Sequence, residues 1–442
     1  MTVMPEDKSV TTPSMSILPL WFKRAMAIAG LFLALPGLLI VAAYCLLSVV
    51  LTLDADADAA AISTFGLTFA LLTLGAGGTA LWHASRSLNN KASGVLRLPP
   101  IWAMIGVFGL CVALAGAISV YDIAAGLLFP PFFLFAAALP PLWAVSWFVG
   151  RQSEDAAGLT WRRGLVAFAG GATLGVLVAI LLEILFPAII LSLVLDFANT
   201  AVRHVESLMR TLSNQQIAEA LTHPGFIYVF VQLALIAPLA EEIAKPLVTL
   251  PLLKQLSRCE AFWIGAMAGA GFAALENVIY AGAGFSIWAG ILVLRALGGA
   301  VHPLGAGLVA LAWRDMLRGE AGAWRMLLRR FGVAAGMHAL WNGGTLVVIA
   351  LAGARFFGEL PPEIEVLGLS AAGTTLALLI ILGLGALWMG RSVLNVVAES
   401  ETEAAPADVR FVLSDRAVAV WALACLVAIL PAGVAGLKLL FW

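Results

Sequence analysis

Long stretches of apolar residues follow one another along most of this chain. A helix needs about 20 such residues to cross the hydrocarbon core of a bilayer. Stretches of that kind cover residues 25–53, 60–84, 100–121, 127–149, 164–195, 225–252, 261–283, 286–313, 331–352, 366–390 and 417–440. Because 62% of the 442 residues are hydrophobic and 12% are charged, a soluble fold could not bury this apolar surface. The sequence therefore predicts an all-α fold, a polytopic transmembrane helical bundle of about 11 spans.

The distribution of Lys and Arg predicts the orientation of these spans. With a cytoplasmic N-terminus, nineteen of the 25 Lys and Arg residues fall in cytoplasmic segments and four in outer segments. Positive residues favour the cytoplasmic side, so we expect the N-terminus inside the cell and an odd number of spans. The net charge of −1 leaves no basic surface for nucleic acid. Richness in Ala, Leu and Gly with little Lys is typical of a bacterial, multi-pass protein of the cell (inner) membrane.

The polar segments divide the chain into five parts. In order, they are a cytoplasmic N-terminal tail at 1–24, spans one to five at 25–195, an extracytoplasmic amphipathic loop at 196–224, spans six to nine at 225–352, and spans ten and eleven at 353–442 with a polar cytoplasmic loop at 391–416. The amphipathic loop either connects two spans or caps a site.

Ionisable side chains inside the spans are rare and lie mostly on consecutive spans. Each costs several kcal/mol near the bilayer centre and is by default a functional candidate. They are Glu183, Glu241, Glu242, Lys245, Glu276, Arg295, His302 and His338. All except Glu183 fall on spans six to nine, which indicates that these four spans form one functional unit.

Span six carries two adjacent carboxylates and a lysine, in the sequence Glu241-Glu242-x-x-Lys245-Pro246. Lys245 follows the two carboxylates at helical spacing, so it can neutralise either of them on one face. Two adjacent carboxylates do not both ionise cheaply in a low dielectric, which suits a general acid or base. Pro246 cannot donate to the carbonyl of Glu242, so the helix should be kinked or opened there. A snorkelling charge cluster at the end of the span is the alternative interpretation.

Spans seven and eight each bring polar side chains to the same unit. Glu276 and Asn277 are adjacent on span seven, where a structural hydrogen bond between helices is the alternative role. Arg295 and His302 are seven residues apart on span eight and so share a helix face. Gly298 and the other Gly and Pro residues around His302 should loosen the backbone there, which is tolerated where protein or a wet cavity surrounds it.

Span nine adds His338 and Asn342, four residues apart on one face. Carboxylates and imidazoles on facing helices can activate water through a divalent metal. They can also do so directly, with Glu as the base and His and Asn as oxyanion donors. The spans contain no HExxH helix and neither the GxSxG nor the GxGD motif, which argues against serine and aspartyl intramembrane chemistry. An enzyme that activates water is the first class of function that these residues suggest. A proton- or ion-coupled transporter is the second class, although no paired broken-helix repeats are evident. A catalytically inactive scaffold is the third.

Four motifs, in order, resemble those of the PrsW family of intramembrane proteases. They are Glu241-Glu242-x-x-Lys245, Phe272-x-x-x-Glu276-Asn277, His302 and His338-x-x-x-Asn342, within roughly residues 225–350. The related CAAX prenyl endopeptidases have His in place of Glu276 and Arg in place of Lys245, so the PrsW family fits better. The resemblance implies an endopeptidase that hydrolyses peptide bonds of membrane proteins such as a single-span regulator, in regulated proteolysis for signalling.

The resemblance, together with the residues that share helix faces, identifies the candidate residues of the site. The catalytic candidates are Glu241, Glu242, Lys245, Glu276, Asn277, His302, His338 and Asn342. The metal ligands, in a metalloprotease with zinc as the expected ion, are Glu241, Glu276, His302 and His338. In a glutamate-type protease without metal, Glu241 would be the base. Glu242 would share the proton, Lys245 would compensate charge, and Asn342 with His338 would stabilise the oxyanion. Arg295 would orient a carboxylate and is the substrate-binding candidate.

Overall fold

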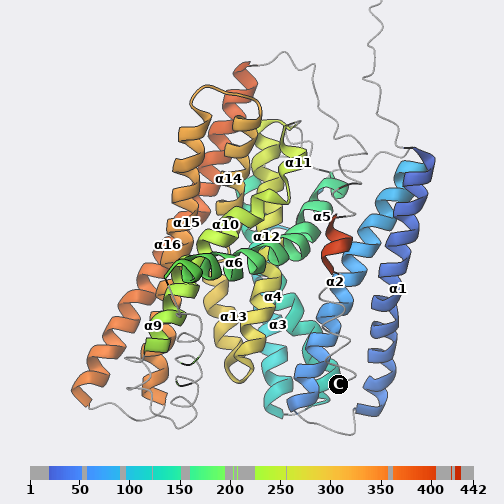
Figure 1. Ribbon diagram of the computed structural model, residues 1–442. Coiled ribbons are helices and arrows are strands. Elements are labelled where there is room, and N and C mark those ends of the chain that lie inside the picture. Colours follow the sequence, from blue (N-terminus) through green and yellow to red (C-terminus); the bar gives the residue numbers. More distant parts are fainter. Residues whose placement is uncertain are drawn as a thin grey trace, which may run out of the picture.

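The computed structural model shows a bundle of long helices (Figure 1). It describes residues 19–51, 57–89, 96–121, 123–150, 160–194, 224–254, 256–356, 362–404 and 424–429, with residues 203, 207 and 420. Helices make up nearly all of these residues, and no β-strand occurs among them, so the predicted all-α membrane bundle is confirmed. Within the described ranges, nine helices are long and apolar enough to cross a membrane, or ten if one bent pair counts as a span.

Four helices correspond to the first four expected spans. The helices α1 (Leu20–Leu51) and α2 (Ala57–Leu88) pack against each other at one side of the bundle, in blue in Figure 1. Next come α3 (Ile101–Tyr121) and α4 (Ala125–Val149), which also pack as a pair. The α4 helix contacts α2 on one side and the later part of the chain on the other. It therefore connects the N-terminal helices to the helices that carry the motifs.

The fifth expected span contains a turn of π-helix. It consists of α5 (Trp161–Gly170), the π-helical η2 (Gly171–Gly175) and α6 (Val176–Val194). A side chain on Gly171 would overlap the backbone carbonyl of Ala268, and one on Gly271 would overlap that of Phe168. Small residues at such crossings let helix backbones approach closely. These two glycines therefore allow the fifth span to lie directly against the seventh.

The sixth expected span is divided at two places. It begins with α9 (Pro224–Val231), continues through the π-helical η3 (Gln232–Ile236), and then forms α10 (Ala237–Leu247). The α10 helix continues through Glu242 and Pro246 and ends one residue later, and the short α11 (Leu250–Leu253) follows. π-Helical turns within α-helices often occur at functional sites.

The seventh expected span, α12 (Arg258–Ala283), lies at the centre of the bundle and is buried along most of its length. Its start is fixed by a capping box, in which Ser257 and Glu260 each bind the other's backbone N–H. The helix packs against α4, α5, α10 and α14 (Val301–Leu317). Side chains on α12 can therefore reach groups from several helices at once.

The eighth expected span, residues 286–313, is not one continuous helix. It consists of α13 (Trp288–Leu297) and α14, which are bent by 42° relative to each other. The residues between the two helices include Gly298 and Gly299, which have low helix propensity. A side chain on Gly298 would also overlap the ring of Trp341, so this position requires the close approach that glycine permits.

Two long helices follow, α15 (Ala323–Phe356) and α16 (Pro362–Ala404). The α16 helix includes residues 391–404, so the first part of the expected polar loop at 391–416 continues the preceding span as a helix. The rest of that loop lies outside the described residues, as do most of the N-terminal tail, nearly all of the expected loop at 196–224 and most of the expected span at 417–440.

Candidate active site

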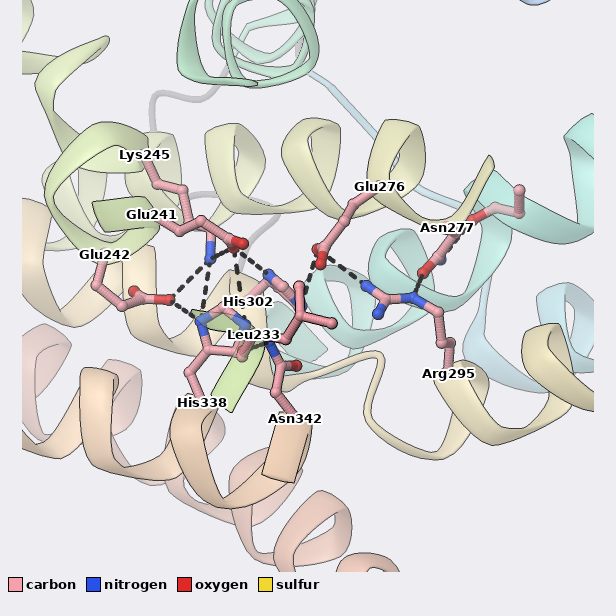
Figure 2. A network of polar contacts seen from close by, with 11 residues as sticks. Leu233, Glu241, Glu242, Lys245, Glu276, Asn277, Arg295, His302, His338 and Asn342 are labelled. Atoms are coloured by element: carbon pink, nitrogen blue, oxygen red, sulfur yellow. Dashed lines mark hydrogen bonds and ion pairs between the residues drawn. The ribbon is translucent and has the colours of Figure 1, made fainter. Parts of the chain in front are cut away.

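The polar residues predicted from the four motifs come together inside the bundle (Figure 2). They are Glu241, Glu242 and Lys245 on α10, Glu276 and Asn277 on α12, Arg295 on α13, His302 on α14, and His338 and Asn342 on α15. Each exposes 8% or less of its surface. The side chains therefore face one another and are shielded from both solvent and lipid.

Lys245 lies between the two adjacent carboxylates of α10. Its Nζ is 3.0 Å from Glu241 Oε2 and 2.8 Å from Glu242 Oε1. The same Nζ lies 4.6 Å from the centre of the Phe272 ring, in a cation–π geometry. Lys245 is fully buried. A snorkelling lysine would extend out of the apolar region, so that alternative interpretation is wrong.

The two histidines are arranged alike around Glu241. His338 has Nδ1 at 3.0 Å from Glu242 Oε1 and Nε2 at 3.7 Å from Glu241 Oε2. His302 has Nε2 at 3.3 Å from Glu276 Oε2 and Nδ1 at 3.9 Å from Glu241 Oε2. Each imidazole thus has a carboxylate beside one ring nitrogen and presents the other nitrogen towards Glu241. Histidine ligands of metals are oriented by carboxylates in this way.

The residues present fit a divalent metal. Glu241, His302 and His338 each offer one ligand atom, and these atoms lie within 4.8 Å of one another. Within the described part of the chain, both ring nitrogens of His302 and Nε2 of His338 are buried without a hydrogen-bond partner. Tetrahedral zinc with bonds of about 2.0–2.1 Å holds its ligand atoms roughly 3.4 Å apart. The separations of 3.7 and 3.9 Å from Glu241 Oε2 are close to that spacing.

Glu276 lies on the far side of His302 from this three-residue group. Its Oε2 pairs with Arg295 Nη2 at 2.9 Å. Arg295 Nε in turn donates to Asn277 Oδ1, and Asn277 Nδ2 donates to the carbonyl of Ala137 on α4 at 2.8 Å. The structure therefore places Glu276 beside a ring nitrogen of His302 that faces away from Glu241, and Arg295 against Glu276.

Asn342 lies near the histidines but is engaged with the backbone. Its Nδ2 donates to the carbonyl of Leu233 at 3.1 Å, and Leu233 belongs to the π-helical turn η3 (Figure 2). A π-helical turn displaces backbone carbonyls from the regular pattern and leaves them in need of other partners. In this structure the Asn342 amide holds that turn against α15.

Two aromatic residues complete the surroundings of the site. The Phe272 ring is stacked against the His302 ring, with centroids 6.1 Å apart and planes inclined by 22°. Phe272 is part of a motif, but its contacts do not follow from sequence. Tyr280, which the sequence reasoning missed, lies with its ring centre 4.6 Å from Arg295 Cζ. The sequence signal that could have identified Tyr280 is its position one helical turn after Glu276, on the same helix face.

Two glycines make room for the site where helices cross. A Cβ on Gly269 of α12 would lie 2.5 Å from the carbonyl oxygen of His302. A Cβ on Gly305 of α14 would lie 2.6 Å from Glu242 Oε2. Real side chains do not approach so closely. The positions of His302 and Glu242 therefore depend on glycine at the facing positions.

Comparison with known proteins supports the arrangement. Residues 160–361 match the family model described as PrsW family intramembrane metalloprotease. The chain carries a PrsW-family protease domain. The PrsW match includes every residue of the candidate site and extends to α5, η2 and α6, which the four motifs leave out. PrsW proteins are intramembrane metalloproteases, so this chain is a peptidase embedded in a membrane. No curated protein and no solved structure matches the chain.

Proposed function

We propose that the protein hydrolyses peptide bonds of membrane-spanning proteins at Glu241, His302 and His338, with a divalent metal held by these three residues. The observation that carries the proposal is the shared orientation of the two imidazoles. Each has a carboxylate beside its outer nitrogen, and the nitrogens directed at Glu241, together with Nε2 of His302, have no hydrogen-bond partner among the described residues. Such buried atoms are costly unless a ligand satisfies them.

Two imidazoles and one carboxylate are a donor set that suits zinc, and zinc is the ion that we propose. Glu241, His302 and His338 would hold the ion, which would supply Lewis-acid chemistry for the scissile carbonyl and for water. Three protein ligands would be the number found in catalytic zinc sites.

The remaining charged residues orient the two histidines and balance the charge of the site. Glu242 orients His338 through Nδ1, and Lys245 compensates the charge of Glu242. Glu276 lies against Nε2 of His302, and Arg295 compensates the charge of Glu276. Both imidazoles are thereby kept with the inner nitrogen facing Glu241. Burial of these carboxylates, cations and imidazoles excludes bulk water and strengthens the electrostatic interactions among them.

We assign the proton transfers to Oε1 of Glu241, because Oε2 is the atom that faces both imidazoles and is proposed to hold the metal. This Oε2 lies within 4 Å of both imidazoles and 3.0 Å from Lys245. As the oxygen of the attacking water bonds to the carbonyl carbon, its proton passes to Oε1 of this carboxylate. The proton then moves to the leaving amine nitrogen as the C–N bond breaks.

The substrates that we propose are single-span regulatory proteins of the same membrane, cleaved during signalling. Their chemistry fits because a site enclosed by apolar helices is most accessible to polypeptides that share the bilayer. The richness in Ala, Leu and Gly with little Lys favours the cell (inner) membrane of a bacterium.

Cleavage of a single-span reporter by the purified protein in proteoliposomes tests the proposal. We expect the wild-type protein to cut the reporter, and Glu241→Gln and His302→Ala each to lower the rate at least about 100-fold. Glu260→Gln is the matched control because Glu260 is buried near the start of α12 and pairs with Arg163. Unchanged cleavage by Glu241→Gln would contradict the assignment. Proton-coupled uptake by liposomes without any cleavage would indicate a transporter instead.

A further inference from the structure

Glu183 lies outside the four motifs, yet the structure brings it next to the site. On α6, Val176 and Ala179 pack in one apolar cluster with Ala244 of α10 and Phe272 of α12. Glu183 follows Ala179 by four residues and Val176 by seven, so it continues the same face of the helix. The α6 helix therefore directs Glu183 towards the helices that carry the motifs.

A hydrogen bond and helix packing bring this part of α6 next to the site. Gln232 Nε2 donates to the backbone carbonyl of Glu183 at 3.4 Å, which ties α6 to the π-helical turn η3. The α6 helix also packs against α10, which carries Glu241 and Glu242. Glu183 therefore lies on a helix that borders the residues proposed to hold the metal.

Glu183 differs from the other carboxylates of this region in exposure and in pairing. It is partly exposed, whereas Glu242 and Glu276 are buried. Glu242 pairs with Lys245, and Glu276 pairs with Arg295. No ion pair to Glu183 occurs among the described residues. Glu183 is thus a partly exposed carboxyl group beside the site with no cation in contact among the described residues, which favours pairing with a cation brought by a ligand.

We propose that Glu183 is a specificity-determining residue that binds a Lys or Arg side chain of the substrate beside the scissile bond. This inference rests on the proposed protease function and adds a substrate class to it: membrane-spanning polypeptides with a basic residue at the cut. A carboxylate near a low-dielectric region gains more from such a pair than one in water does.

The test compares reporters that differ in one residue. The cut in a single-span reporter is mapped by mass spectrometry, and each flanking residue is replaced in turn by Lys, Gln or Glu. We expect the wild-type protein to prefer a Lys reporter over the Gln version by about 10-fold in kcat/KM, mainly through KM. Glu183→Gln should bring the ratio of Lys to Gln cleavage to about one, because its amide carries no charge. Glu183→Lys should prefer the Glu reporter.

Leu181→Gln is the matched control because it places the same amide on α6 at an exposed position. It should keep the wild-type preference. An unchanged ratio of Lys to Gln cleavage in both Glu183 variants would overturn the inference, even with full proteolytic activity.

A binding measurement separates this inference from the proposed function. Binding of fluorescent Lys, Gln and Glu peptides to the Glu241→Gln protein in nanodiscs is measured by anisotropy, with and without Glu183→Gln. Tighter binding of the Lys peptide that disappears with Glu183→Gln supports the role of Glu183. Equal affinities for the three peptides overturn it. Absence of cleavage by the wild-type protein would count against the protease proposal alone.

Discussion

Replacing Glu242 by Gln tests how the site holds one of its histidines. Glu242 Oε1 lies 3.0 Å from His338 Nδ1 and 2.8 Å from Lys245 Nζ. A carboxylate in this place fixes the tautomer with a proton on Nδ1 and leaves Nε2 facing Glu241. A Gln amide keeps the shape but loses the charge and can turn its NH2 group towards the ring. Loss of such an outer partner lowers metal affinity about 10- to 100-fold, or about 1.4–2.8 kcal/mol.

Competition with a zinc-binding indicator measures this affinity in detergent or nanodiscs. The matched control is Glu260→Gln, since Glu260 lies sixteen residues before Glu276 on α12, about 24 Å along the helix. The control removes a buried ion pair with Arg163, so it lowers the free energy of unfolding but should leave zinc affinity unchanged. Equal zinc affinity in Glu242→Gln and wild type would refute the role of Glu242.

Two further substitutions test the packing and the charge balance. Gly269→Ala should lower cleavage at least about 10-fold and the free energy of unfolding by about 1–3 kcal/mol, because its Cβ would lie 2.5 Å from the backbone carbonyl of His302. Gly336→Ala, which meets no atom within 4 Å, is the control, and equal losses in both variants would contradict this reasoning. Arg295→Met should lower the free energy of unfolding by about 3–5 kcal/mol, because it leaves the Glu276 carboxylate buried without its cation. Thermal unfolding should show most of this loss recovered when Glu276→Gln is added, and simple additivity of the two changes would contradict the pairing.

The sequence predicted most of the fold because long apolar stretches report spans directly. The expected span at 127–149 corresponds to α4 (Ala125–Val149), and the one at 261–283 to α12 (Arg258–Ala283). The bend between α13 and α14 lies at Gly298, where the sequence predicted a loosened backbone within one span but not two separate helices. Hydropathy measures how apolar a stretch is and not whether its helix continues, so a broken span has the same signal as a continuous one.

The residues of the candidate site could be predicted from the sequence, but their contacts between distant helices could not. Helical spacing correctly indicated that Lys245 could reach both neighbouring carboxylates, because those contacts are local. The contact of Asn277 with Ala137 joins residues 140 positions apart, and that of Asn342 with Leu233 joins residues 109 apart. Such contacts depend on which helices pack together, and one sequence contains no signal for that choice.

Metal content measured together with activity tests the central claim most directly. Purified wild-type protein and the His302→Ala and His338→Ala variants are analysed by elemental mass spectrometry, and the same samples are assayed on the single-span reporter. The account predicts about one zinc ion per wild-type chain, loss of most of that zinc in both folded variants, and parallel loss of cleavage. Full cleavage by a wild-type sample from which a chelator has removed all metal would contradict it.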